Sequence, residues 1–138
     1  MSGPIKVLRT GLEAEHAAVY VLGVLASRTS AGSLASALEE SFAFHRDARD
    51  ALLARLAELG DTAPPGAAPA YELPGGIGTE AGVRAAALGI EQRATAGYGD
   101  QVAASTGPDR IRAIGWLSAA AVRQLSFGGS PIELPGLA

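Results

Sequence analysis

Residues 61–78, DTAPPGAAPAYELPGGIG, form a linker rich in proline and glycine, and the length of this linker restricts the topology of the chain. A chain of about 18 residues can reach about 60 Å when extended. A helix of about 25 residues is only about 37 Å long. The linker can therefore run the whole length of a helical bundle and start the following helix at the end where the preceding one began. The apolar side chains of Tyr71, Leu73 and Ile77 predict that the linker lies on the bundle.

Four segments with helical composition flank this linker, two on each side. Their apolar residues recur at spacings of three and four, which is typical of a buried helical face. Thr79 is a good N-cap for the third segment, and Pro108 suits the first turn of the fourth. The expected helices cover residues 5–28, 33–59, 79–105 and 109–127, with a crossover at 61–78 and an apolar C-terminal strap at 128–138.

These elements predict one all-α domain over residues 1–138. Short connections make the helices on either side of them antiparallel neighbours, while the long linker joins the two pairs. An up-down pair, one long crossover and a second up-down pair make a four-helix bundle of ferritin-like topology. A flexible hinge between two helical hairpins is the alternative that the linker length leaves open.

Two of the helices carry apolar patterns that bear on assembly. Residues 17–26, AAVYVLGVLA, are apolar almost all round, so this part of the first helix must be covered on more than one side. A central position or a homodimer contact would provide that cover. Trp116 is expected off the inward stripe of the fourth helix, as a packing residue under the crossover or at a dimer contact. That predicted inward stripe consists of Ile111, Ile114, Leu117, Ala121, Val122 and Leu125.

Composition argues against several classes of protein. Cysteine is absent, which excludes disulfides, thiolate metal sites and cysteine nucleophiles. The net charge of −3 argues against a nucleic-acid-binding protein, which normally has a basic face. The apolar run at 17–26 is shorter than the roughly 20 residues of a membrane span, and Glu13 and Glu15 precede it where a signal peptide has basic residues. We expect a cytoplasmic protein that binds neither nucleic acid nor a membrane.

Several polar side chains stand on helix faces where leucine is expected. At about 100° per residue, Glu15 lies within the stripe of the first helix. His45 and Arg49 lie within the stripe of the second, and Glu91 shares a face with Tyr98 on the third. A lone buried charge is very costly, so these groups must pair with one another, bind an ion or contact water. We expect a buried polar network in which Arg49 pairs with one glutamate and His45 with the other.

A metal site is the alternative interpretation of the same side chains. A di-iron bundle needs a glutamate from each of two helices and a Glu-x-x-His pair from each of the other two. Glu13 and His16 have that spacing, but they stand on the first helix, and the whole set is short of carboxylates. The sequence therefore favours no cofactor and a degenerate di-iron site. In the alternative, iron or manganese is held by Glu13, Glu15, His16, His45 and Glu91, or a single ion by three of them, Glu15, His45 and Glu91.

The chain resembles the short ferritin-like proteins of actinobacteria that are grouped as a domain of unknown function. The resemblance rests on EHAAVY at 15–20, HR and RD within 45–50, PAY and LP within 69–74, Glu91, Tyr98, and PGL at 135–137. It implies a ferritin-like four-helix bundle and no established activity, so no catalytic residue follows from it. The iron-binding Glu-x-x-His pairs of the wider ferritin-like superfamily are absent from the second and fourth helices.

These observations predict a non-catalytic ferritin-like bundle with a structural or partner-binding role, assembled as a homodimer. A metal-dependent oxidase or metal carrier with a degenerate carboxylate and histidine site is the rival expectation. A third is that the bundle core binds a small apolar ligand, because alanine and glycine leave space between helices.

Overall fold

Four α-helices make up most of the structure, a computed structural model that describes residues 3–30 and 32–137. They are α1 (Gly3–Ser27), α2 (Ser33–Glu58), α3 (Glu80–Ala104) and α4 (Gly107–Ser126), and the described residues contain no strand. The predicted all-α four-helix bundle is confirmed, and each helix begins and ends within one turn of its expected bounds. No helix in the described ranges is long and apolar enough to cross a membrane.

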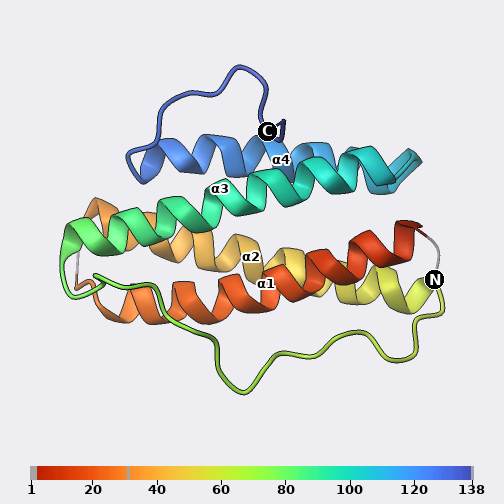
Figure 1. Ribbon diagram of the computed structural model, residues 1–138, viewed down its shortest axis with the longest axis horizontal. Helices are drawn as coiled ribbons and strands as arrows, with labels where there is room; N and C mark the ends of the chain where they lie inside the picture. The colour runs from red at the N-terminus through yellow and green to blue at the C-terminus, as the bar shows by residue number, and fades with distance from the viewer. Residues whose placement is uncertain (1–2, 31, 138) are drawn as a thin grey trace.

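The helices form two antiparallel hairpins, α1 with α2 and α3 with α4 (Figure 1). The hairpins meet mainly through α1 against α3 and, less extensively, through α2 against α4. The segment between α2 and α3 runs along α1 from one end of the bundle to the other, so α3 starts at the end where α2 started (Figure 1). This is the long crossover that the linker length predicts, and the alternative of a hinge between the hairpins is wrong.

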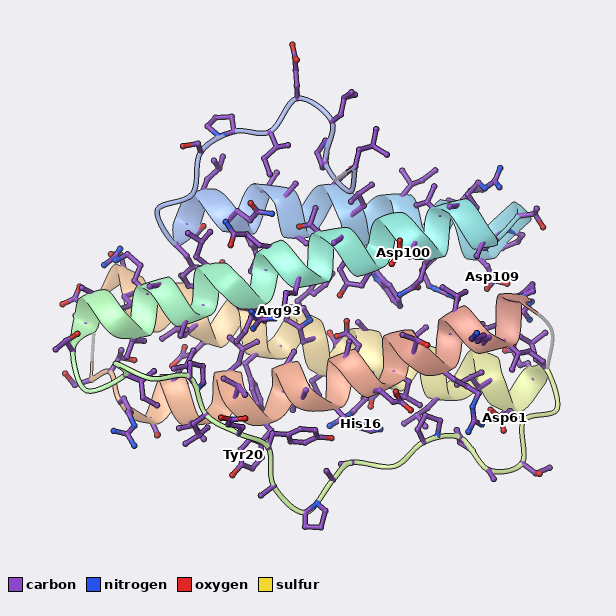
Figure 2. The ribbon with its side chains drawn as sticks, in the orientation of Figure 1. His16, Tyr20, Asp61, Arg93, Asp100 and Asp109 are labelled. Carbon is purple, nitrogen blue, oxygen red and sulfur yellow. The ribbon has the colours of Figure 1, made fainter. Side chains whose placement is uncertain are left out.

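Polar side chains of α1 hold the first part of the crossover. Arg9 Nη1 donates a 2.6 Å hydrogen bond to Asp61 Oδ2, which is also an ion pair. His16 Nε2 donates a 3.0 Å hydrogen bond to the backbone oxygen of Pro65. Figure 2 shows His16 on the side of α1 that faces the crossover. These bonds supply partners to a segment whose prolines exclude a helix.

Apolar contacts hold the later part of the crossover. The rings of Tyr20 on α1 and Tyr71 lie 5.4 Å apart between centroids, and Ile77 is buried in the core. The crossover therefore covers a third side of α1, next to the sides that α2 and α3 cover. The apolar circumference of α1 is explained within one chain, and it no longer argues for a subunit contact.

The orientation of α4 differs from the prediction. Ile111 is 71% exposed and Val122 is 63% exposed, and Ile114 and Leu125 are exposed as well. The buried face of α4 is the opposite one, and it consists of Ala113, Ala120 and Gln124. Small residues on this face let α4 approach α3 closely, so the packing gained there outweighs the burial of four larger side chains.

The segment after α4 returns over the α3–α4 hairpin (Figure 1). Its Gly136 lies so close to Gly99 on α3 that a Cβ atom on Gly99 would stand 2.6 Å from the Gly136 carbonyl oxygen. The large apolar side chains of this strap, Ile132, Leu134 and Leu137, are exposed.

Two apolar clusters fill the two ends of the bundle. One contains Leu22, Leu25 and Leu38, and the other contains Leu8 and Leu52. Along α1 a single buried carboxylate, described below, lies between the two clusters. The polar site therefore has leucine side chains on both sides of it along the bundle axis.

Candidate functional site

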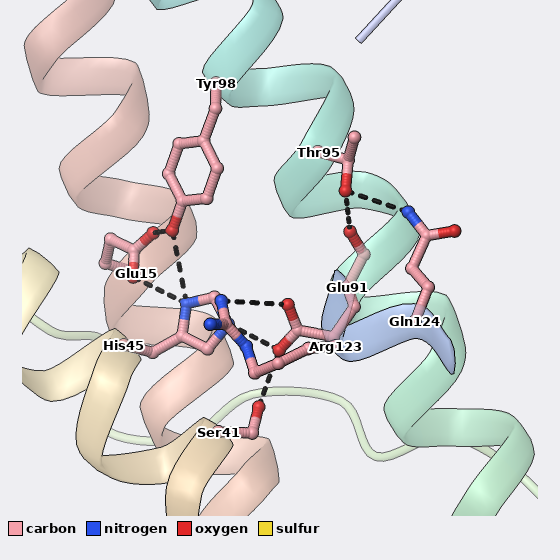
Figure 3. A network of polar contacts seen from close by, with 8 residues as sticks. All are labelled: Glu15, Ser41, His45, Glu91, Thr95, Tyr98, Arg123 and Gln124. Atoms are coloured by element: carbon pink, nitrogen blue, oxygen red, sulfur yellow. Dashed lines mark hydrogen bonds and ion pairs between the residues drawn. The ribbon is translucent and has the colours of Figure 1, made fainter. Parts of the chain in front are cut away.

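Side chains from all four helices meet in the centre of the bundle (Figure 3). Glu15 comes from α1, His45 from α2, Glu91 from α3 and Arg123 from α4. His45 and Glu91 have no exposed surface, and Glu15 is only 3% exposed. Each stands on a helix face whose other members are mostly apolar, so burial of the face carries the polar group inward.

The imidazole of His45 lies between the two carboxylates. Its Nδ1 atom is 2.8 Å from Glu15 Oε2, and its Nε2 atom is 2.8 Å from Glu91 Oε1. Both ring nitrogens face carboxylate oxygens, which only accept hydrogen bonds. The ring satisfies both contacts only as an imidazolium, with each N–H donating to one carboxylate.

The pKa values of the site agree with this protonation. Burial opposes the charged form of His45, but hydrogen bonds and charge from Glu15 and Glu91 outweigh it and raise the His45 pKa to about 9. Burial also works to raise the Glu91 pKa, yet His45, Arg123 and Ser41 together lower it below its ordinary range. At neutral pH the site therefore holds a carboxylate–imidazolium pair.

Two hydroxyl groups add hydrogen bonds to the carboxylates. Tyr98 donates a 2.6 Å bond to Glu15 Oε1, and Ser41 donates a 2.6 Å bond to Glu91 Oε1. Burial, followed by the negative charge of Glu15, raises the Tyr98 pKa, so the phenol stays neutral and remains a donor. Glu15 thus accepts a bond at each oxygen.

Arg123 is the second cation of the site, and the sequence pattern did not identify it. Its Nη2 atom lies 3.3 Å from Glu91 Oε2, which is within ion-pair distance but lacks hydrogen-bond geometry. Its guanidinium carbon lies 3.6 Å from the ring centroid of Phe44, a cation–π contact. Two carboxylates therefore face two cations, and the formal charges of the site balance.

The prediction that Arg49 joins this network is wrong. Arg49 Nε donates a 3.0 Å bond to its neighbour Asp50, and its side chain is 27% exposed. Arg49 stands one turn beyond His45 at the margin of the buried face, where a long side chain reaches water more easily than the core. Arg123 from α4 pairs with Glu91 instead.

A second set of contacts extends from Glu91 towards α4. Gln124 Nε2 donates a 2.8 Å bond to Thr95 Oγ1, which in turn donates a 2.7 Å bond to the backbone oxygen of Glu91. The sequence gives no sign of Gln124, because the stripe of α4 that was expected to face inward is the exposed one. Trp116 also lies on the inner face of α4, with its ring 5.6 Å from the ring of Tyr98.

The metal alternative does not fit this geometry. Glu13 is exposed, and His16 is bonded to the crossover rather than to the network. The ring of His45 separates Glu15 from Glu91 and uses both of its nitrogens, so these three side chains do not converge on one point. Within residues 3–30 and 32–137, no group of three or more histidine, aspartate or glutamate side chains has the geometry to hold a metal ion. Arg123 adds a fixed positive charge beside Glu91.

Comparisons with known proteins agree with this architecture. A family model described as a domain of unknown function, DUF4439, matches residues 7–138. Among solved structures, the crystal structure of a conserved hypothetical protein from Mycobacterium tuberculosis superimposes with a TM-score of 0.83 at 26% sequence identity. The superposition covers 96% of this chain and 95% of that chain. The comparison with curated proteins gave no match.

Proposed function

Because this chain belongs to the DUF4439 family, whose description assigns no activity, we propose a function from its own geometry: a non-catalytic, ferritin-like bundle that acts by binding a protein partner. The observation that carries the proposal is the position of His45 between Glu15 and Glu91. Metal-binding bundles of this topology use axial carboxylates to hold metal cations. In this chain the cations are the side chains of His45 and Arg123.

A self-neutralised site is poorly suited to chemistry. Each oxygen of Glu15 accepts a hydrogen bond, both His45 nitrogens donate one, and none of these groups has appreciable contact with solvent. Such networks contribute directional contacts between helices rather than a reactive group. The role of the site is therefore to define how the helices pack.

The partner-binding role is supported by the outer face of α4. Its exposed apolar residues recur at helical spacing and form one stripe, on the side opposite the core. Exposed apolar patches on monomers typically mark interaction surfaces. The stripe consists of Ile111, Ile114, Val122 and Leu125, with the small Ser118 between its halves.

A second copy of the chain fits this stripe best. None of its side chains is charged, so two copies related by a two-fold axis can meet along α4 without burying a charge. With Ser118 included, successive members of the stripe are three or four residues apart, which places them on one face of the helix. We propose a homodimer through α4, in place of the contact through α1 that the apolar run at 17–26 suggested.

Elemental analysis tests the non-catalytic assignment against the metal alternative. The protein is purified without chelator and analysed before and after incubation with ferrous iron or manganese. We expect no stoichiometric metal under either condition. Retention of one or two ions per chain, lost on Glu15→Ala and kept in the exposed control Glu13→Ala, would establish the oxidase or carrier alternative.

Sedimentation velocity tests the homodimer. The wild-type chain should sediment as a dimer at micromolar concentration, and Val122→Glu should sediment as a monomer. Gln92→Glu adds the same charge at an exposed position of α3 and should remain dimeric. A wild-type monomer, or equal dimerisation of both variants, would contradict the proposal.

A further inference from the structure

A pocket of about 190 Å³ lies between α1 and α3, at the interface of the two hairpins. The network residues Glu15, His45 and Tyr98 form one part of its wall. An apolar protein cavity of about 150 Å³ is large enough to bind benzene. The volume therefore accommodates a molecule about one aromatic ring in size with a small substituent.

Most of the pocket wall is apolar. The lining side chains of α1 include Ala14, Ala18 and Val21, and those of α3 include Ile90 and Ala94. Alanine on both facing helices leaves the space that larger residues would fill. A ligand that occupies this space must have an apolar body.

Gln101 supplies an unsatisfied polar group to the same pocket. The residue is only 2% exposed, and its Oε1 atom is buried without a hydrogen-bond partner among the described residues. Its Nε2 atom faces Gly11, which has no side chain to meet it. A buried amide oxygen without a partner is costly, so this position calls for a group that donates a hydrogen bond.

The pocket also carries one exposed cation. Arg93 lines it from α3, and Figure 2 shows this side chain on the side of α3 that faces α1. A positively charged ligand would meet this guanidinium, so the lining favours a neutral molecule or an anion over a cation.

We infer that this pocket binds a compact, mostly apolar molecule about one aromatic ring in size, whose hydroxyl or carboxamide group pairs with Gln101. This binding site is separate from the α4 face that the proposed homodimer uses. A ligand bound in the pocket would contact Tyr98 and Glu15. Binding would therefore alter the contacts of the network that joins the hairpins.

Titration of the full chain, followed by amide NMR shifts, tests the inference. The probes are benzamide, benzyl alcohol and toluene, which share an aromatic body and differ in the polar group. We expect saturable shifts at residues lining the pocket with the first two probes, and at least about tenfold weaker binding of toluene, which has no group to pair with Gln101. Equal binding of all three probes, or no saturable shift because the pocket holds water only, would overturn the inference.

Two pocket variants and one control variant separate ligand binding from folding. A Cβ atom at Gly97 would meet nothing within 4 Å, so Gly97→Leu should fill the pocket and reduce benzamide affinity at least about tenfold. Ala96→Leu, the exposed neighbour on the same helix, should leave affinity unchanged. Gln101→Leu breaks no hydrogen bond between side chains, and it should reverse the preference in favour of toluene. Unchanged benzamide binding in both pocket variants would contradict the site.

Discussion

The Tyr98 hydroxyl on α3 donates a 2.6 Å hydrogen bond to Glu15 Oε1 on α1, across 83 positions of the chain. This bond joins the two hairpins, as does the contact of His45 on α2 with Glu91 on α3. Apolar packing between helices is largely non-directional, whereas these bonds require specific atoms to face one another. The network therefore fixes the register of one hairpin against the other.

Removal of the Tyr98 hydroxyl should weaken the bundle. Tyr98→Phe keeps the ring but leaves a buried carboxylate oxygen of Glu15 without its donor, which should lower the free energy of unfolding by about 1–3 kcal/mol. Urea denaturation measures the change. Tyr71→Phe is the control, because the Tyr71 hydroxyl lies on the exposed crossover and accepts a hydrogen bond only from the backbone amide of Ala68. A Tyr98→Phe variant as stable as this control would show that the bond contributes nothing.

Removal of the central cation should be more damaging. His45→Ala leaves Glu15 and Glu91 buried without the imidazolium between them, and breaking a buried ion pair in this way costs about 3–5 kcal/mol. Arg49→Ala, one turn further along α2, removes an exposed pair and should cost less than about 1 kcal/mol. Denaturant midpoints of the two variants make the comparison, and equal losses would contradict the central position of His45.

Stability should fall as pH rises above neutral. The folded-state pKa of His45, about 9, lies above its ordinary value of 6.5, so the folded chain binds this proton more tightly. The resulting stabilisation is complete below pH 6.5 and is lost progressively as the pH rises to about 9, by up to about 3 kcal/mol. Denaturation at several pH values between 6 and 9.5 should show this decline.

Two features of that profile can be checked further. His45→Gln should flatten the decline, because the titrating group is gone. Glu91, whose pKa is lowered, contributes stability that is present above its ordinary pKa and is lost as the pH falls below it. Stability that increases between pH 6.5 and 9 would contradict the assigned protonation.

An alanine at Gly99 should displace the C-terminal strap. The new Cβ atom would stand 2.6 Å from the Gly136 carbonyl oxygen, so the strap must move off α3. Faster amide hydrogen exchange in residues 130–137 should result. Gly97→Ala, where the added atom meets nothing within 4 Å, should leave this exchange unchanged and stabilise α3 by up to about 1 kcal/mol. Identical exchange in both variants would show that the strap does not depend on this contact.

The helices and the crossover could be predicted because their signals are local. Helical periodicity, the cap at Thr79 and the prolines of 61–78 each act within a few residues, and the length of the linker restricts the topology. Thr79 does cap α3, accepting a 3.0 Å bond from the amide of Gly82. The inward carboxylates and His45 were identified on the same basis, because a polar residue inside an apolar stripe is visible in the sequence.

The orientation of α4 could not be predicted, because α4 carries two stripes of helical spacing on opposite faces. One has larger aliphatic residues such as Ile111 and Val122, and the other has Ala113, Ala120 and Trp116. The first stripe has more aliphatic surface to remove from water, so the sequence favours its burial. Close packing against α3 selects the second, and that choice depends on the facing surface rather than on α4 itself.

Arg123 was missed for the same reason. In the observed orientation of α4, Arg123 lies beside the inner stripe and above the ring of Phe44. The signal that could have found it is electrostatic: two buried glutamates need two cations, and His45 provides only one. Arg49 was the nearer candidate in the sequence, but its position at the margin of α2 lets it remain partly in water.

NMR titration of the His45 ring is the decisive measurement of whether a protonated imidazole lies between the two buried carboxylates. The chemical shifts of both ring nitrogens should report an imidazolium at pH 7, with both N–H groups protected from exchange and a pKa of about 9. A neutral ring at pH 7, with a pKa at or below 6.5, would contradict the account.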